Sequence, residues 1–258
     1  MPQTKIVFFD IDGTLIDMQA KRITPKMLET LHRLQDRGIK ICIATGRSPM
    51  VLPKIDGVAF DAYLTFNGSL CYDRKGVIFS NPIPHKDVVR FIPNAAALGR
   101  PVCVSTRDRL AANGTDTDLT DYFFIANEPV PVADDFDAVC AEDIYQLMLG
   151  CRPKDYPALL DGAPGAKIAA WWDRAVDVIP AGGGKGIGIE KMLAYYGLDK
   201  AEALAFGDGN NDREMLQAVG TGVAMENGSP ELKSIADEIC GPVYEDGIYH
   251  YCADKGLI

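Results

Sequence analysis

Two aspartates separated by one residue, Asp10 and Asp12, directly follow the first apolar segment of the chain. That segment, residues 6–9, is β-branched and aromatic, which favours a strand buried on both faces, as in a parallel sheet. Ligands of open α/β sheets bind beyond the carboxyl ends of the strands, where these two side chains fall. Two carboxylates so close need a cation or a shared proton. Because Mg²⁺ prefers oxygen ligands and an aspartate can attack phosphorus, the pair indicates phosphoryl-transfer chemistry, although an acidic turn at a strand end has the same appearance.

Three further segments place polar groups at the end of a predicted strand or at the start of a predicted helix. Residues 39–44 form a second apolar strand, a glycine run at 181–184 precedes an apolar-periodic segment, and residues 204–206 are apolar again. The polar groups and glycine that follow these segments are, in chain order, Thr45, Gly46, Arg47, Lys185, Asp208, Asn210, Asn211 and Asp212.

The glycine run before Lys185 does not form a P-loop. A Walker sequence requires glycine five residues before the Gly-Lys pair and Ser or Thr after the lysine. These places hold Ile179 and Gly186. A glycine-rich loop before a helix N-terminus can still bring a lysine to a phosphate, aided by the backbone and the helix dipole. The alternative is a flexible hinge with a solvated lysine.

In this order the four segments resemble the four sequence motifs of the haloacid dehalogenase superfamily of phosphotransferases. The chain is most similar to the Cof-type branch of small-molecule phosphatases, which carry a large α/β cap inserted between the second and third motifs. The resemblance covers essentially all 258 residues. Four motifs in order are far more specific than any one of them.

The resemblance implies catalytic and metal-binding roles for four aspartates. Asp10 would be the nucleophile that forms an aspartyl phosphate. Asp12 would be the general acid for the leaving alcohol and then the base for the attacking water. Mg²⁺ would be held by the Asp10 carboxylate, the backbone carbonyl of Asp12 and the Asp208 carboxylate. Asp212 would orient the site, either from behind these ligands or through a water molecule.

The same resemblance assigns the phosphate contacts. The Thr45 hydroxyl and the Gly46 amide would bond to phosphoryl oxygens, and Asn211 would bind another. Lys185 would neutralise the charge shared by nucleophile and phosphate. Many relatives carry serine where this chain has Gly184, so no side-chain contact is expected from that position.

Two residues beside these motifs can each have either a functional or a structural role. Arg47 either reaches the substrate beyond its phosphate or closes on the cap; alternatively, it is a surface arginine paired with a carboxylate of the core. Asn67, at the end of a third predicted strand over residues 61–66, is either a turn-forming residue or a polar lip of the site.

Composition agrees with a soluble enzyme, and the cysteines point to the cytoplasm. Charged residues make up 24% and hydrophobic residues 47% of the chain, the net charge is −10 and no dense cationic block is present, which disfavours nucleic-acid binding. No signal peptide and no membrane-length apolar run is visible. The seven cysteines include no Cys-x-x-Cys pair. Cys42, Cys103 and Cys151 lie in apolar strand-like runs, so we expect them to be buried reduced thiols and not parts of a disulfide or zinc framework. The oligomeric state is expected to be a monomer or a small homo-oligomer.

The expected fold is α/β, with a doubly wound parallel-sheet (Rossmann-like) core and an inserted α/β cap. Thr24 and Pro25 start a helix that Gly38 ends, and strand and helix patterns alternate on either side of it. The pattern breaks at Asn81-Pro82-Ile83-Pro84 and again at Ile179-Pro180-Ala181-Gly182. The predicted catalytic core is therefore residues 1–81 and 181–258, and the predicted substrate-specificity cap is residues 82–180.

Within this cap the only two tryptophans, Trp171 and Trp172, end a predicted strand over residues 167–172. Because successive side chains of a strand point to opposite faces, at most one ring can line a cleft. Either both rings pack within the cap, or one of them forms an apolar wall against the substrate's leaving group, with Asp173 or Arg107 as a polar contact nearby.

The sequence therefore predicts a magnesium-dependent phosphatase of small phosphorylated metabolites, with sugar phosphates as the first choice. A sugar phosphomutase of the same superfamily would share the fold and the nucleophile, and product analysis separates the two. A non-enzymatic phospho-receiver module also uses a strand-end aspartate. Such a module needs neither Asp12 as a general acid nor an insert of this length.

Overall fold

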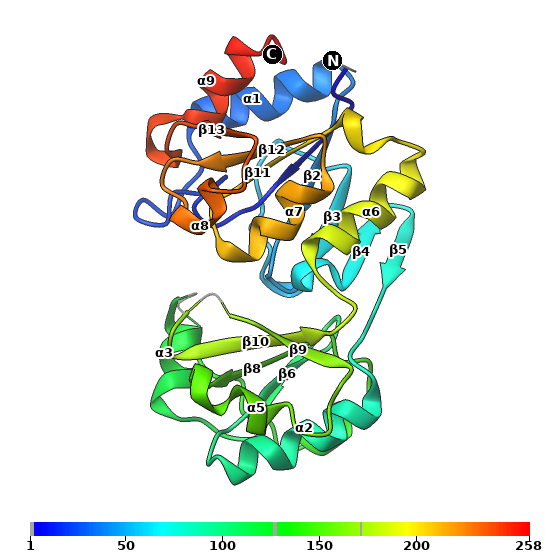
Figure 1. The fold of residues 1–258 in the computed structure, drawn as a ribbon, viewed down its shortest axis with the longest axis vertical. Helices are drawn as coiled ribbons and strands as arrows, with labels where there is room; N and C mark the ends of the chain where they lie inside the picture. The colour runs from blue at the N-terminus through cyan, green and yellow to red at the C-terminus, as the bar shows by residue number, and fades with distance from the viewer. Residues whose placement is uncertain (1–2, 126–127, 171) are drawn as a thin grey trace. The chain divides into compact units, whose positions relative to one another are not determined.

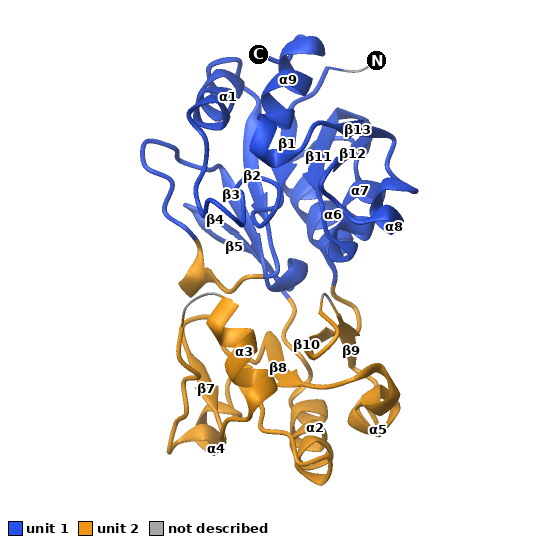
Figure 2. Ribbon diagram, turned by 90° about the vertical axis from the view of Figure 1, so that its left-hand side faces the viewer, with its two compact units in different colours: residues 1–46, 53–80, 184–258 blue, residues 47–52, 81–183 orange. Residues whose placement is uncertain are grey.

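The computed structural model describes residues 3–125, 128–170 and 172–258 of the chain (Figure 1). The chain divides into two compact units, coloured separately in Figure 2. The first comprises Met1–Gly46, Pro53–Ser80 and Gly184–Ile258, and the second comprises Arg47–Leu52 and Asn81–Gly183. The second unit thus includes residues 47–52, 81 and 181–183, which lie in the predicted core range.

The first unit is built on an eight-stranded sheet in the order β13-β12-β11-β1-β2-β3-β4-β5. Six neighbouring strands are parallel: β1 (Ile6–Phe9), β2 (Lys40–Ala44), β3 (Ala62–Thr65), β11 (Ala203–Gly207), β12 (Thr221–Met225) and β13 (Glu238–Cys240). An antiparallel hairpin, β4 (Leu70–Asp73) and β5 (Gly76–Ser80), extends one edge. The predicted α/β fold with a parallel core sheet is confirmed, and the hairpin adds two strands that the sequence did not predict.

Helices cover both faces of this sheet (Figure 1). They are α1 (Pro25–Asp36), α6 (Lys185–Tyr196), α7 (Arg213–Ala218), α8 (Pro230–Lys233) and α9 (Gly247–Asp254). On one face, α6 and α7 bury Ile189, Met192 and Met215 against the strands. On the other, α9 places Tyr251 edge-on against Phe206 of β11, with ring centroids 5.4 Å apart. The doubly wound arrangement leaves the carboxyl ends of the central strands at one edge of the sheet.

The first helix forms where the sequence predicts it. Thr24 is the N-cap, and its Oγ1 accepts a hydrogen bond from the Met27 N–H at 3.1 Å. Leu31 and Leu34 are buried on the inner face, and the backbone turns at Gly38 with a φ of +74° before β2 begins. The cap hydroxyl, the helical spacing of the apolar residues and the terminal glycine each act within one or two turns of helix.

The second unit has an antiparallel five-stranded sheet in the order β7-β6-β8-β10-β9. Its elements are α2 (His85–Ala97), β6 (Cys103–Ser105), β7 (Leu110–Ala112), α3 (Thr117–Ile125), α4 (Phe136–Val139), β8 (Gln146–Gly150), α5 (Tyr156–Leu159), β9 (Ala166–Ala169) and β10 (Ala175–Pro180). One face packs against α2 and α5, and Leu119 and Phe123 of α3 pack on the other. Each unit therefore has a hydrophobic core of its own.

Two predictions about this second unit are wrong. Ile179 and Pro180, predicted as part of a linker, belong to β10, which is buried along its whole length. Proline is tolerated there because it is the last residue of the strand. The strand predicted over residues 167–172 ends at Ala169, and Trp172 lies in a bend after it. Alternation along a strand therefore does not decide how this tryptophan points.

Trp171 lies outside the described residues, and the structure gives Trp172 a local partner. The guanidinium carbon of Arg174 lies 4.4 Å from the centroid of a Trp172 ring, a cation–π contact within one loop. Arg107, the other predicted polar contact, lies 3.8 Å from the Asp108 carboxylate in an exposed ion pair.

All seven cysteines are free, and six of them are buried. The burial predicted for Cys42, Cys103 and Cys151 is confirmed, and Cys140 is only partly covered. Among the helices of the described ranges, none has the length and apolar character needed to span a membrane.

Candidate active site

The predicted site residues of the first unit follow four neighbouring parallel strands. Asp208 comes after β11, Asp10 after β1, Thr45 after β2 and Asn67 after β3, and these strands are adjacent in that order. The carboxyl ends of parallel strands meet at one edge of a sheet, which brings together loops that are far apart in sequence. Lys185 enters the same region as the first residue of α6.

Lys185 bridges two carboxylates in the interior of the first unit. Its Nζ donates to Asp10 Oδ1 at 2.7 Å and to Asp212 Oδ1 at 2.6 Å. The three residues are 1%, 7% and 0% exposed, respectively. Burial alone would lower the pKa of Lys185, but the two carboxylates outweigh it and raise that pKa above its ordinary value. The ammonium therefore stays charged and holds the Asp10 carboxylate in a fixed orientation.

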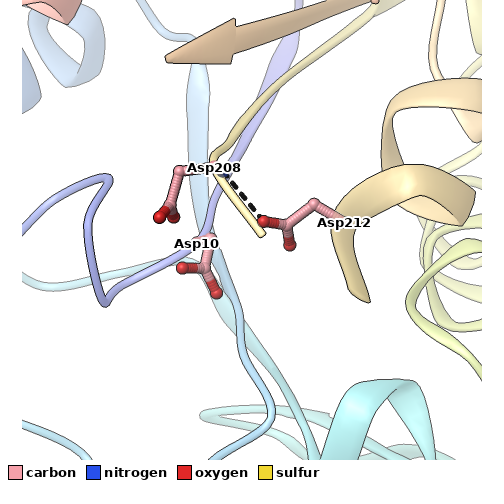
Figure 3. A group of neighbouring side chains, drawn as sticks. All are labelled: Asp10, Asp208 and Asp212. Carbon is pink, nitrogen blue, oxygen red and sulfur yellow. Dashed lines mark hydrogen bonds between the residues drawn. The ribbon is translucent and has the colours of Figure 1, made fainter. Parts of the chain in front are cut away.

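Asp10, Asp208 and Asp212 form a compact carboxylate cluster (Figure 3). One oxygen from each lies within 4.8 Å of the others. Burial, reinforced by the neighbouring carboxylates, raises the pKa of Asp10 well above its usual range despite the opposing charge of Lys185. Burial and the nearby Asp212 raise the pKa of Asp208 to about 7, although a hydrogen bond from Thr14 opposes the shift. A cation between these oxygens would relieve the repulsion that adds to burial in raising both pKa values.

The oxygens of Asp212 are already engaged by the protein. Oδ2 accepts hydrogen bonds from the backbone N–H groups of Asp208 and Gly209, each at 2.9 Å, while Oδ1 accepts the bond from Lys185. These contacts fix the loop that carries Asp208. They suit a residue that positions the site better than one that offers both oxygens to a cation.

Thr14 and Gly13 also shape the cluster, although neither was predicted as a site residue. Thr14 Oγ1 donates to Asp208 Oδ1 at 2.9 Å, and the threonine is 1% exposed. Gly13 has a φ of +87°, and any side chain there would overlap the Asp208 carboxylate. The signal was present in the sequence, because Gly13 and Thr14 directly follow the two aspartates.

Beside the carboxylates lie the residues predicted to contact phosphate. The backbone N–H of Thr45 donates to the Leu64 carbonyl at 2.8 Å, and its own carbonyl accepts from the Asn67 N–H at 3.0 Å. Asn211 Nδ2 donates to Asn67 Oδ1 at 3.2 Å. The α-carbon of Gly46 lies close to the Asn67 amide. The structure therefore brings Thr45, Gly46 and Asn211 together through Asn67.

Three other residues named from the sequence have different surroundings. Asp12 is half-buried in the turn after β1. Asn210 Oδ1 accepts a hydrogen bond from Ser229 Oγ at 2.8 Å. Arg47 belongs to the second unit, where its Nη1 donates to the Val51 carbonyl at 2.9 Å.

Strand-end aspartates, a buried lysine and an acidic loop thus lie at one edge of the sheet. Comparison with known families identifies the family that has this arrangement. The family model of haloacid dehalogenase-like hydrolases matches residues 7–252. The chain belongs to this family. Its membership confirms the superfamily predicted from the motifs and the prediction that the chain is a hydrolytic enzyme.

Relatives of this haloacid dehalogenase-like hydrolase carry phosphatase names. YkrA of Bacillus subtilis, named as a candidate phosphatase, is 35% identical over 257 residues that cover 99% of each chain. The 5-amino-6-(5-phospho-D-ribitylamino)uracil phosphatase YitU of the same species is 28% identical over 262 residues, covering 95% of each chain. A solved structure of a subclass IIB sugar phosphatase has a TM-score of 0.87 at 29% identity, covering 99% of this chain and 100% of its own.

Proposed function

We propose that this protein is a magnesium-dependent phosphatase that hydrolyses small phosphorylated metabolites, sugar phosphates in the first place, through an aspartyl phosphate on Asp10. The observation that carries the proposal is the buried Lys185 held between Asp10 and Asp212, beside Asp208. A buried charge network at the carboxyl ends of parallel strands is costly to keep unless it serves chemistry.

The carboxylate cluster fits a divalent cation. Asp10, Asp208 and Asp212 together carry three negative charges when ionised, against the single positive charge of Lys185. We assign the Asp10 and Asp208 carboxylates and the Asp12 carbonyl as the groups that would hold Mg²⁺, with Asp212 behind them. Bound there, Mg²⁺ would supply positive charge to the phosphoryl oxygens during transfer. All-oxygen donors of this kind suit magnesium.

The chain's own residues would then carry out two displacements at phosphorus. A carboxylate oxygen of Asp10 attacks the phosphorus, and the bond from phosphorus to the substrate's ester oxygen breaks. Asp12 gives its proton to that leaving oxygen. In the second step Asp12 takes a proton from water, the water oxygen attacks the same phosphorus, and the bond to Asp10 breaks. Inorganic phosphate leaves, and both aspartates return to their starting states.

Lys185 and the polar residues at the strand ends would stabilise the transferring group. The Lys185 ammonium reduces the repulsion between the Asp10 anion and an anionic phosphate, because it already bonds to that carboxylate at 2.7 Å. Thr45, Gly46 and Asn211 lie close to one another through Asn67 and are assigned to the phosphoryl oxygens. Positioning and electrostatics of this kind supply most of the rate acceleration in phosphoryl transfer.

The substrate class is proposed from the relatives, and the second unit is proposed to select it. One relative is named for a phosphoribityl compound, and a solved neighbour is a sugar phosphatase. We retain residues 82–180 as the proposed specificity cap, because this insert has its own sheet and its own hydrophobic core. Arg47 is proposed to contact the substrate beyond its phosphate.

A phosphate-release screen tests the function. The purified protein would be incubated with Mg²⁺ and a panel of sugar phosphates, nucleotides and pyridoxal phosphate. We expect release of inorganic phosphate from sugar phosphates at a higher kcat/KM than from the other classes, and loss of activity with EDTA. Formation of an isomeric sugar phosphate without phosphate release would instead identify a mutase. A preference for another class would overturn the substrate proposal, and activity that persists in EDTA would overturn the role of the metal.

A further inference from the structure

The turn after β3 has an uncommon backbone for the residues it contains. Phe66 and Asn67 both have φ values of +51°, and Gly68 follows at +89°. Glycine adopts such angles freely and asparagine tolerates them, but a phenylalanine there is rare. Residues held in sparsely populated backbone regions cluster at functional sites, where the surrounding structure fixes them.

This turn contacts the elements that carry the proposed phosphate ligands. The backbone N–H of Asn67 donates to the Thr45 carbonyl, and its Oδ1 accepts from Asn211 Nδ2 at 3.2 Å. A Cβ on Gly46 would lie 3.2 Å from Asn67 Nδ2. The adjacent Gly68 packs against the Gly184 carbonyl, directly before Lys185. Asn67 therefore lies among three of the segments assigned to phosphate.

One half of the Asn67 amide remains without a protein partner. The residue is 3% exposed, and its Oδ1 is taken by Asn211. Within residues 3–125, 128–170 and 172–258, Nδ2 makes no hydrogen bond. The described side-chain atoms that are fully buried without a partner are Ser48 Oγ, Ser69 Oγ and Asp87 Oδ2, so Asn67 Nδ2 keeps some accessible surface. An unpaired N–H donor with accessible surface is open to an acceptor from outside the protein. An anionic oxygen bound in this region would supply the acceptor.

The backbone alone does not account for an asparagine here. A glycine would adopt a φ of +51° without strain, so the turn by itself favours glycine at position 67. The amide adds two things: an acceptor that holds Asn211 and a donor that makes no hydrogen bond within the described residues. The bond from Asn211 also fixes which end of the amide carries the donor.

We propose that Asn67 is a further substrate-binding residue, whose Nδ2 donates a hydrogen bond to an oxygen of the transferring phosphoryl group. The inference rests on the proposed phosphatase function, because it assigns a ligand to the same site. It adds the turn formed by residues 66–68 to the motif loops as a part of that site.

Asn67→Gly separates the amide from the backbone, because glycine keeps the turn without strain. Binding of orthovanadate, a phosphate analogue, would be measured by titration calorimetry in the presence of Mg²⁺. We expect the dissociation constant to rise about 10- to 100-fold, as for loss of a hydrogen bond to a charged group. Mg²⁺ affinity and melting temperature should stay close to wild type. Lys21→Gly is the matched control, since Lys21 also has a φ of +50° but lies in an exposed turn.

A double variant separates direct contact from an effect through Asn211. In an Asn211→Ala background, Asn67→Gly should still weaken orthovanadate binding by about tenfold or more if Nδ2 touches the anion. A change within twofold in that background would overturn the proposal and leave Asn67 as a residue that only positions Asn211. Wild-type protein that binds no orthovanadate with Mg²⁺ present would instead count against the proposed function itself.

Discussion

Asp10 and Lys185 are the residues on which the proposed chemistry depends most. They are 175 positions apart, yet the Lys185 ammonium bonds directly to the Asp10 carboxylate. The bond aligns Asp10 for attack and opposes the rise in its pKa that burial causes. It also means that substitutions at Asp10 must preserve the shape of the side chain if chemistry is to be separated from folding.

Asp10→Asn should therefore abolish turnover while the fold is kept. The amide nearly matches the carboxylate in shape and can still accept a hydrogen bond from Lys185, but it cannot form the acyl phosphate. We expect kcat to fall by ~10³-fold or more, with an unchanged circular dichroism spectrum. Activity within tenfold of wild type in a folded variant would remove Asp10 as the nucleophile.

Asp12→Ala should affect both chemical steps, because one residue serves both proton transfers. An aryl phosphate with a good leaving group, such as a nitrophenol, needs little help from an acid. The first step should then be partly rescued, so that phosphoenzyme accumulates and can be trapped with acid. Equal losses for good and poor leaving groups, with no trapped intermediate, would contradict the dual role.

Asp208 should make the metal-free protein less stable as the pH rises. Its pKa is about 7 in the folded chain against an ordinary value of 3.8, so the folded state keeps a proton that the unfolded chain releases between these values. The stabilising contribution is complete below about pH 4 and is lost as the pH approaches 7. Urea unfolding in EDTA at pH 5 and pH 8 would measure this loss.

The isosteric variant Asp208→Asn serves as the reference for that measurement. It should show a smaller drop in unfolding free energy between the two pH values, because it cannot release the proton. Mg²⁺ should restore stability to the wild type at pH 8 and have much less effect on the variant. An equal pH dependence in both proteins would show that Asp208 does not titrate in this range.

Among the elements, α6 determines where Lys185 lies. The helix approaches β3 and the turn after it closely, since a Cβ on Gly188 would lie 2.9 Å from Leu64 Cγ and 3.0 Å from the Gly68 α-carbon. Close approach of this kind requires glycine and transmits any displacement of the helix to the buried lysine. The packing of α6 is thus part of the geometry of the site.

Gly188→Ala should consequently lower both stability and orthovanadate binding. Overpacking of a filled core costs about 1–3 kcal/mol, and the helix must shift to relieve it. We expect a lower melting temperature together with weaker orthovanadate binding. Glu190→Ala, on the exposed side of the same helix, is the control and should leave both unchanged. A variant with wild-type stability and binding would show that α6 accommodates the methyl group without moving.

At the scale of the whole molecule, the two units have separate hydrophobic cores and separate clusters of charged residues. In the second unit, the Asp118 carboxylate forms ion pairs with three arginines. The N···O distances are 3.0 Å to Arg100, 3.1 Å to Arg152 and 3.8 Å to Arg174, and the Asp118 side chain is 12% exposed. A carboxylate surrounded by three guanidinium groups stabilises α3 locally. None of these residues belongs to the proposed catalytic site of the first unit.

Asp118→Ala should lower stability without affecting the proposed chemistry. Removing the shared partner leaves three arginines close together, and for a partly exposed cluster we expect a loss of about 2 kcal/mol. Asp161→Ala, which breaks the exposed Arg90–Asp161 pair at 2.8 Å, should cost less than about 1 kcal/mol. Urea unfolding would provide the comparison. Equal losses in the two variants would show that the cluster around Asp118 adds nothing beyond a surface ion pair.

The sequence by itself determined the family, the parallel core strands and the positions of the chemical groups. Strand β1, the capped helix α1 and the Gly-Lys start of α6 are encoded by patterns a few residues long. For that reason they could be predicted from single segments. The acidic residues were likewise placed at strand ends by local sequence alone.

Only the tertiary structure decided which of these groups meet. The Lys185–Asp212 bond spans 27 positions and the Asn211–Asn67 bond spans 144, and no local pattern records such pairings. Strand β10 was missed because its terminal Ile179-Pro180 looks like a linker until pairing with β9 buries it. Propensity and periodicity act within a few residues, whereas the site is assembled by sheet order and core packing, which act across the whole first unit.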